Sequence, residues 1–160
     1  MKIYWKKSPI HGLGIFAKVP LKRGETAAII KGVRHKKVNK SMRDVFMHPD
    51  WVGYEEFEWI DPRPPYKYLN HSCEPNVGVR GRFLLTALRD IRADEEITID
   101  YSIIEPDPRW FMKCGCGKKN CRKVVRAIEL LPQKLFNKYD PYIPRAMKKL
   151  YARKEKSLAK

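Results

Sequence analysis

The four cysteines of this chain constrain its fold more than any other feature of the sequence. Cys114, Cys116 and Cys121 lie within eight residues, and Cys73 is the fourth. The N-terminus shows no apolar stretch typical of a secretory signal, so we expect an intracellular protein, in which clustered cysteines indicate a metal ion rather than disulfides. Structural zinc takes four ligands in a tetrahedron. We therefore predict one structural Zn²⁺ bound by all four cysteines, with the fold bringing Cys73 to the other three.

The alternative to a zinc site is a set of buried thiols without a ligand. Glycine and lysine surround the three clustered cysteines, and such a segment does not form an apolar interior. The lysines also favour the thiolate form, which is the form that binds metal. We therefore prefer the zinc site.

Short β-strand patterns dominate the chain before residue 105. Apolar runs alternate with glycine- and proline-containing turns, as in a chain of small strands. The elements that we expect are strands within residues 1–33, at 57–60 and at 96–101, a hairpin of 77–79 with 83–88, and a short helix over 39–50 that Asn39 or Ser41 caps. These elements predict a mostly β fold.

The chain from residue 124 onward shows helical spacing instead. Ile128, Leu131, Leu135 and Tyr139 follow one another at three- and four-residue steps. Two prolines interrupt the pattern, and residues 146–156 predict a second, very basic helix. This segment could pack on the core, bind nucleic acid or form an interface.

Charge is unevenly distributed along the chain. Lys and Arg number 34 against 18 Asp and Glu, a formal net charge of +16, which favours contact with nucleic acid or with a complex that contains it. The basic C-terminal tail is the candidate for that contact. Most of the acids cluster at 50–61 and 94–107. No apolar run approaches the ~18 residues that span a bilayer, so we expect no membrane segment.

Four segments resemble the motifs of the SET-domain family of protein-lysine methyltransferases. In order along the chain, residues 11–17 read HGLGIFA, 68–76 read YLNHSCEPN, 96–101 read EITIDY and 114–121 read CGCGKKNC. A glycine motif alone is weak support, but the ordered set of four is specific. The last segment is similar to the zinc-binding post-SET segment of the family.

The resemblance implies the SET fold, or β-clip, in which small curved β-sheets surround a knot-like core. It implies a SET domain over 1–104, a post-SET segment over 105–126 and a basic helical extension over 127–160. In the family, the cysteine of the NHSC motif joins the three post-SET cysteines on one zinc. This agrees with the ligand set Cys73, Cys114, Cys116 and Cys121.

The resemblance also implies S-adenosylmethionine as the methyl donor. The positions that match the family's cofactor site are His11, Gly12, Leu13, Gly14, Asn70, His71 and Tyr101. Glycine lets a backbone approach a ligand closely, although Gly12 and Gly14 could also form an ordinary turn. Asn70 and His71 could equally serve in a structural hydrogen-bond network.

Tyr101 matches the catalytic tyrosine of the family. Methyl transfer needs the amine, the methyl carbon and the sulfur nearly in line, so positioning supplies most of the acceleration. The Tyr101 hydroxyl and nearby carbonyl groups can hold the methyl group through weak C–H···O contacts. An apolar channel and the sulfonium charge lower the pKa of the substrate lysine, so we expect no side-chain base. The alternative is a core tyrosine at a strand end.

Two further residues are weaker candidates for the substrate pocket. Tyr54 precedes a strand where the family often places another pocket tyrosine, although an exposed structural aromatic residue would fit nearly as well. Ile99 stands at the family's product-specificity position. Isoleucine cannot donate the hydrogen bond that a tyrosine donates there, so we hypothesise multiple methylation.

The sequence thus predicts a protein-lysine N-methyltransferase that uses S-adenosylmethionine. Its substrate would be a basic protein (histone-like, DNA-associated or ribosomal) in the cytoplasm or the nucleus. The acidic segments would line the substrate groove or form only a solvated face. The alternative function is a catalytically inactive, basic zinc-binding module that binds nucleic acid or chromatin-like complexes.

Overall fold

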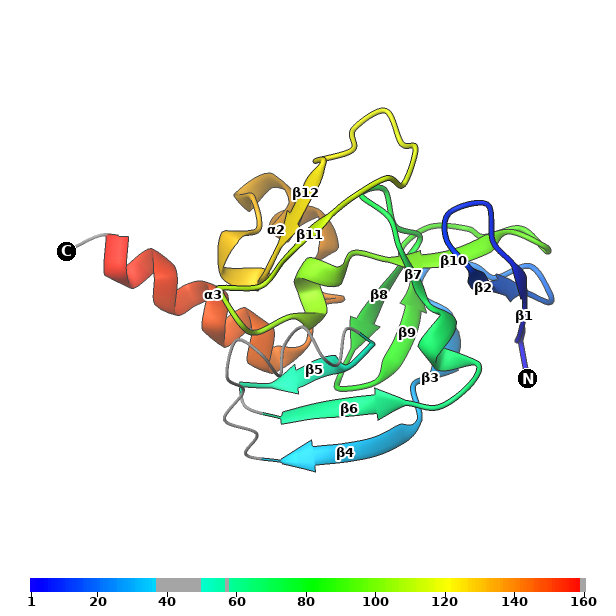
Figure 1. Cartoon of the computed structure of the whole chain (residues 1–160), viewed down its shortest axis with the longest axis horizontal. Helices are drawn as coiled ribbons and strands as arrows, with labels where there is room; N and C mark the ends of the chain where they lie inside the picture. The colour runs from blue at the N-terminus through cyan, green and yellow to red at the C-terminus, as the bar shows by residue number, and fades with distance from the viewer. Residues whose placement is uncertain (37–49, 57, 159–160) are drawn as a thin grey trace.

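The structure of the protein is a computed structural model that describes residues 1–36, 50–56 and 58–158. The helix expected over 39–50 lies outside the described residues, apart from Asp50 in a turn. Strands form four small sheets in the described part of the chain, and both α-helices lie near its C-terminal end (Figure 1). The predicted mostly β fold of small sheets is confirmed.

One sheet brings distant parts of the chain together. Its strands, in spatial order, are β1 (Ile3–Lys7), β2 (Leu13–Ala17), β10 (Glu96–Ile99) and β7 (Asn70–His71). β7 and β10 run parallel, with Thr98 opposite Asn70 and Ile99 opposite His71. Parallel neighbours need a long connection, and here the chain between them supplies two strands of another sheet. This pairing places residues 70–73 beside residues 98–101.

Two three-stranded sheets surround this centre. One contains β3 (Thr26–Ile29), β9 (Leu84–Ala87) and β8 (Val77–Arg80), and the other contains β4 (Gly32–Lys36), β6 (Glu58–Pro62) and β5 (Val52–Glu55). β8 and β9 form the predicted hairpin, and β6 is the strand expected at 57–60, of which Phe57 lies outside the described residues. Their apolar faces meet in one core, where Val79, Leu85 and Ile97 are fully buried.

The expected helical pattern is wrong at its beginning. Residues 124–126 form strand β12 (Val124–Arg126), which pairs antiparallel with β11 (Phe111–Lys113). The physical reason is that the β-branched Val125 packs against Cys73 and Cys116 instead of continuing the apolar face of a helix. We call residues 111–126 the cysteine hairpin.

The remainder of the C-terminal segment is helical and packs on the core. It contains η3 (Ile128–Leu130), α2 (Gln133–Tyr139) and α3 (Arg145–Leu158). Leu131, Tyr139, Met147 and Leu150 belong to the same buried cluster as the central strands. No described helix is long and apolar enough to cross a membrane. Of the three roles left open for this segment, packing on the core is the one observed.

Two short 3₁₀ helices complete the fold. They are η1 (Tyr66–Tyr68), before β7, and η2 (Tyr101–Ile104), after β10. The strand expected over 96–101 therefore ends at Ile99. Tyr101 begins η2, and this change of direction turns its side chain toward the site.

Candidate active site

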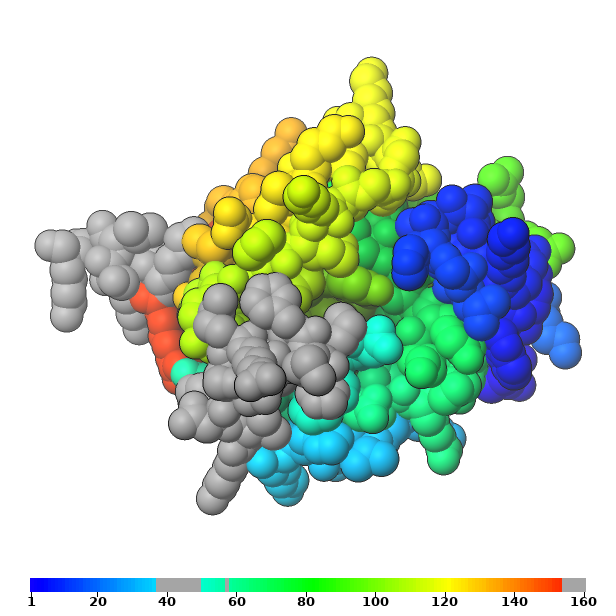
Figure 2. All heavy atoms as spheres, viewed as in Figure 1, coloured from blue at the N-terminus to red at the C-terminus, as the bar shows by residue number. Residues whose placement is uncertain are grey.

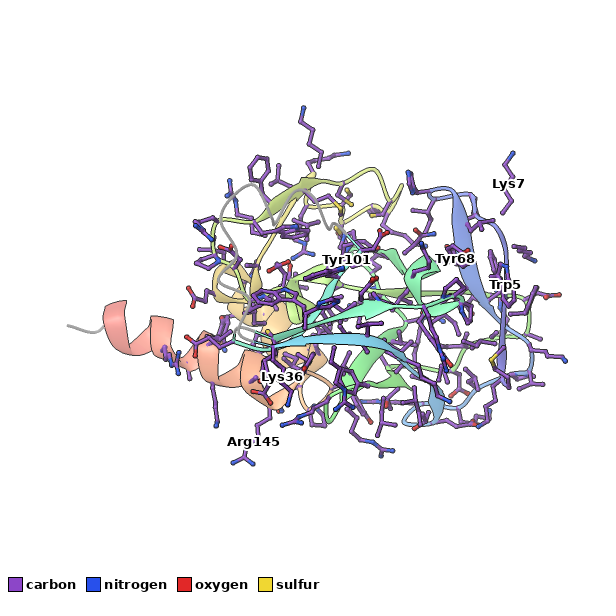
Figure 3. All side chains as sticks on the ribbon, turned by 60° about the horizontal axis from the view of Figure 1, so that its bottom comes forward. Trp5, Lys7, Lys36, Tyr68, Tyr101 and Arg145 are labelled. Carbon is purple, nitrogen blue, oxygen red and sulfur yellow. The ribbon has the colours of Figure 1, made fainter. Side chains whose placement is uncertain are left out.

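Tyr101 lies in the middle of the molecule and borders two pockets, whereas Arg145 and Lys7 project outward at the periphery (Figure 3). The narrow pocket has a cavity volume of about 40 Å³ and is lined by Asp50, Trp51, Val52, Tyr66, Lys67, Leu69, Tyr101, Ile104, Glu105 and Trp110. The wide pocket, of about 400 Å³, is lined by Ile10, His11, Asn70, His71, Tyr101, Met112, Lys113, Cys114, Gly115 and Cys116. Of the residues that the structure describes, Tyr101 is the one that lines both pockets.

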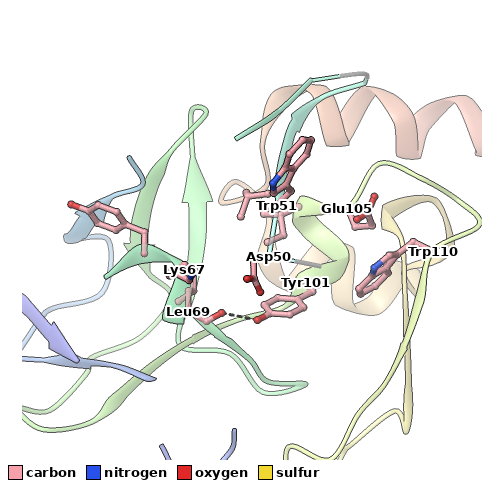
Figure 4. A pocket seen from close by; sticks show the side chains of 10 residues that line it. Asp50, Trp51, Lys67, Leu69, Tyr101, Glu105 and Trp110 are labelled. Carbon is pink, nitrogen blue, oxygen red and sulfur yellow. Dashed lines mark hydrogen bonds between the residues drawn. The ribbon is translucent and has the colours of Figure 1, made fainter. Parts of the chain in front are cut away.

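Tyr101 is held by hydrogen bonds of both its side chain and its backbone. Its hydroxyl donates to the carbonyl oxygen of Leu69 at 2.7 Å (Figure 4), and its backbone N–H donates to Nδ1 of His71 at 3.2 Å. Burial, with a contribution from the Asp50 carboxylate, raises the pKa of Tyr101. The hydroxyl therefore keeps its proton, and its oxygen can accept weak C–H···O contacts at a fixed position.

His71 connects Tyr101 to the cysteines. Burial lowers the pKa of His71 to about 4, so the imidazole is neutral near pH 7 and the contact of Nδ1 with Asp100 at 3.8 Å is not an ion pair. Because Nδ1 accepts from Tyr101, Nε2 carries the proton. Nε2 lies 3.4 Å from Sγ of Cys73 and donates to it. The ring orientation is therefore set from both sides.

Asp100 fixes the start of η2. It is fully buried, and Oδ1 accepts from the Ser102 backbone N–H at 3.0 Å, which makes Asp100 the N-cap of this helix. The same oxygen pairs with Nη2 of Arg122 at 2.6 Å. Arg122 follows Cys121 directly, so this ion pair joins the cysteine hairpin to the residue before Tyr101.

The four cysteines meet as their spacing predicted. Their Sγ atoms lie within 4.8 Å of one another, and those of Cys73 and Cys114 are 3.8 Å apart. Four sulfurs at about 2.3 Å from a zinc ion in a tetrahedron lie about 3.8 Å from each other, so the set fits such an ion. None of the four forms a disulfide. A φ of +68° at Gly117 provides the left-handed turn inside the loop.

The thiols of the cluster differ in acidity. Burial raises the pKa of Cys73 and Cys114, whereas at Cys116 hydrogen bonds outweigh burial and lower the pKa to about 7. A bound cation deprotonates coordinating thiols. Metal binding at this set would therefore release protons.

The residues predicted to bind a cofactor divide into two groups. His11, Asn70, His71 and Tyr101 line the wide pocket. Gly12, Leu13 and Gly14 lie beside it, where the carbonyl oxygens of His11 and Leu13 accept from the Asn70 side-chain amide at 3.1 and 3.0 Å. A Cβ on Gly14 would lie 2.3 Å from Oε1 of Glu96, which also accepts from Asn70. A side chain at position 14 would therefore displace the Glu96 carboxylate from Asn70.

The wide pocket is lined by segments that lie far apart in the sequence. In Figure 2 the N-terminal strands (blue) and the cysteine hairpin (yellow) lie on either side of the central segments (green). Our sequence reasoning missed Met112 and Lys113, which come from β11. The signal that could have found them is their place directly before Cys114.

Two predicted pocket residues are placed differently from Tyr101. Tyr54 is buried in β5, packs edge-on against Phe83 at a centroid distance of 4.9 Å, and lines a separate pocket with Arg82, Arg145 and Lys149 among others. It is not among the described residues that line either pocket at Tyr101. Ile99 is fully buried in β10, paired with His71.

The acidic residues also divide into those that line the narrow pocket and those that lie elsewhere. Asp50 and Glu105 line the narrow pocket with two tryptophans (Figure 4), Asp50 being exposed and Glu105 buried. Glu55 instead pairs with Arg82 at 3.3 Å, and Glu56 pairs with Arg153 at 2.7 Å. Only part of the acidic sequence therefore faces this site.

Several known proteins are similar to this chain in sequence. A family model described as the SET domain matches residues 12–102. Histone-lysine N-methyltransferase 2B of Homo sapiens is 31% identical over 134 residues, covering 74% of this chain and 5% of that protein. Histone-lysine N-methyltransferase TRX1 of Oryza sativa subsp. japonica is 32% identical over 145 residues, covering 80% and 14%. The chain therefore spans a small part of these relatives.

A solved structure is also similar in fold. The crystal structure of a Plasmodium falciparum protein described as a histone methyltransferase superposes with a TM-score of 0.50 and 27% identity, covering 62% of this chain and 92% of that one.

Proposed function

The chain belongs to the SET-domain family, and from that premise we propose that it transfers methyl groups from S-adenosylmethionine to a lysine of a basic, histone-like protein. The observation that carries the proposal is the position of Tyr101, which borders both a wide pocket and a narrow one. Donor and acceptor would enter from these two pockets and meet at the Tyr101 hydroxyl. Holding reacting atoms in line is the main source of acceleration in such a reaction.

The wide pocket fits the cofactor in size and chemistry. A volume of about 400 Å³ lies within the range of small-molecule sites, roughly 300–1,000 Å³. The ammonium group of Lys113, which is exposed, could pair with the carboxylate of the cofactor, and Asn70 holds the carbonyl groups at 11 and 13 in place. When bound, S-adenosylmethionine supplies the activated methyl group.

The narrow pocket would hold the target lysine. Leu69, Ile104 and the two tryptophans give it apolar walls, which exclude water and favour the neutral amine. The exposed Asp50 would attract the charged side chain as it arrives. The amine and the methyl group would then meet at the oxygen atoms of Tyr101 and Leu69, which lie 2.7 Å apart.

The cysteine set would hold one structural Zn²⁺. Four thiolates fill the tetrahedron and leave no position for a substrate, so the ion would act on structure alone. Cys114, Gly115 and Cys116 form part of the wide pocket. By fixing Cys114 and Cys116, the ion would hold one wall of the cofactor site in place.

The substrate class rests on the relatives and on charge. Both curated relatives named above are histone-lysine methyltransferases, and a basic peptide would complement Asp50. Contact with nucleic acid through α3 is a further part of this proposal, since Arg145 projects from the surface (Figure 3) and Lys149 is exposed. An inactive zinc-binding module is the second candidate. It would not need a partly buried tyrosine shared by two pockets.

The test is mass spectrometry of a methylation reaction with labelled S-adenosylmethionine and a mixture of basic proteins. Wild-type protein should transfer label to lysine, and Tyr101→Phe should lower kcat by roughly 100-fold because the methyl group loses a fixed oxygen. Tyr4→Phe is the matched control, since that hydroxyl bonds Asp94 at the surface. No transfer to any protein, together with no detectable cofactor binding by calorimetry, would favour the inactive module.

The same spectra report the degree of methylation. With Ile99 at the product-specificity position, we expect di- or trimethyl-lysine at long reaction times. Monomethyl-lysine alone would refute that hypothesis and leave the transfer reaction itself intact.

A further inference from the structure

One contact between the C-terminal extension, residues 127–158, and the active site is a side-chain hydroxyl group. Tyr139, the last residue of α2, is 1% exposed, and its hydroxyl lies 3.1 Å from Oδ2 of Asp100. Burial and the adjacent carboxylate raise the pKa of Tyr139, so the phenol keeps its proton and donates it. The extension thus contacts the residue that directly precedes Tyr101.

The two oxygens of Asp100 have different partners. Oδ1 accepts from the Arg122 guanidinium and from the Ser102 backbone N–H, whereas Oδ2 accepts from Tyr139. A carboxylate with no exposed surface depends on such donors, because each oxygen without one keeps its full desolvation penalty. Asp100 is consequently the point where η2, the cysteine hairpin and the extension meet.

The orientation of Asp100 sets the orientation of Tyr101. As the N-cap of η2, the Asp100 carboxylate fixes the direction in which this helix leaves β10, and Tyr101 is the first residue of the helix. A rotation of the carboxylate would therefore move the Tyr101 ring relative to the Leu69 carbonyl group. Displacements of about 1 Å at such a site can cost roughly 100-fold in rate.

Several contacts hold the helix that carries Tyr139 in place. The α2 helix is held against α3 by stacking of Phe136 on Tyr151 at 4.0 Å and by the Tyr151 hydroxyl, which donates to Gln133 at 3.0 Å. Beyond α2, the carbonyl oxygen of Tyr142 accepts from the Val79 N–H in β8 at 2.8 Å. The extension is therefore fixed to the central core as well as to Asp100.

We infer that Tyr139 is a positioning residue of the methyl-transfer site, which acts through Asp100 to hold Tyr101 in place. This inference rests on the proposed function. It makes the extension part of the active enzyme in this chain, although the extension lies outside the matched family segment of residues 12–102.

The test compares two tyrosine-to-phenylalanine variants of the full chain. Tyr139→Phe removes only the donor to Asp100, and Tyr151→Phe removes a buried hydroxyl of the same extension that donates to Gln133. We expect Tyr139→Phe to lower kcat on the order of tenfold, with KM for cofactor and peptide within about twofold. Tyr151→Phe should leave kcat within about twofold of wild type, even if both variants lower the melting temperature equally. Equal kcat for the two variants would overturn the inference.

A double-mutant cycle isolates the route through Asp100. Once Asp100→Asn has removed the carboxylate, the additional loss of the Tyr139 hydroxyl should lower kcat by much less than it does alone. If the two changes lower kcat by independent factors that multiply in the double variant, Tyr139 does not act through Asp100. If Asp100→Asn does not fold, the comparison of Tyr139 with Tyr151 decides alone.

A second measurement keeps the inference separate from the proposed function. NMR of protein with ¹³C-labelled tyrosine rings should show the Tyr101 resonances shifted by Tyr139→Phe and unchanged by Tyr151→Phe. Failure of wild-type protein to methylate any substrate would count against the function alone. Unshifted Tyr101 resonances would count against the positioning role alone.

Discussion

The cysteine hairpin and the C-terminal extension both contact the Asp100 carboxylate, but different interactions would hold each region on the rest of the fold. In the hairpin, Phe111 and Val124 are 46% and 41% exposed, and its buried residues are Cys116 and Val125. The extension buries Leu131, Tyr139, Met147, Leu150 and Tyr151 in the main core. With the proposed Zn²⁺ bound, the hairpin would depend on its metal-binding set, whereas the extension depends on apolar packing.

This difference has energetic consequences. Each fully buried large apolar side chain contributes roughly 1.5–3 kcal/mol, so the extension is stabilised by many moderate contributions spread along its length. Structural zinc in small peptides contributes about 10–16 kcal/mol at one point. Removing the ion should release one region and leave the other in place.

Metal removal is the largest effect that we expect. Treatment with a strong chelator should abolish cofactor binding measured by calorimetry, because Cys114, Gly115 and Cys116 form part of the wide pocket. Cys73→Ser should weaken cofactor binding in the same direction, since it removes one ligand. Unchanged cofactor affinity in metal-free protein would contradict the difference between the two regions, because the hairpin would then hold its shape without an ion.

A cavity in the extension should have a smaller and different effect. Met147 is fully buried in α3, and Met147→Ala should lower the free energy of unfolding in urea by about 2–5 kcal/mol. The metal content per chain should stay the same, because the cysteines lie elsewhere. Lys149→Ala, an exposed change in the same helix, should alter stability by less than about 0.5 kcal/mol. Loss of metal from Met147→Ala would show that the two regions are not independent.

The smallest effect concerns a residue that belongs to neither region. Asp50→Asn should raise KM for a basic peptide by roughly two- to fivefold, the range of an exposed ion pair, and leave kcat unchanged. The increase should shrink in high salt. Glu55→Gln is the control, because Glu55 pairs with Arg82. Equal effects of the two changes would indicate general charge attraction rather than a contact at the narrow pocket.

Much of the site could be predicted because its motifs are local. The spacing of Cys114, Cys116 and Cys121 left Cys73 as the remaining thiol ligand, and the structure brings the four together. The adjacent residues Asn70 and His71 also lie in the wide pocket with Tyr101, as the resemblance implied. Each of these groups is defined by a few neighbouring residues.

The rest depends on contacts between distant segments. Helical spacing after residue 124 did not reveal that Val125 packs against the cysteines as part of a strand. Tyr54 was expected near the pocket because it lies close to a predicted strand, but that position did not reveal that it packs near α3 rather than beside Tyr101. The bond from Tyr139 to Asp100 joins residues 39 apart in sequence, and no local pattern encodes it.

Hydrogen–deuterium exchange with and without a chelator tests the central distinction most directly. The account predicts that backbone amides of residues 111–126 lose protection from exchange when the metal is removed. Backbone amides of residues 131–151 in the extension should keep their protection. Simultaneous loss of protection in both regions, or no loss in the cysteine hairpin, would contradict it.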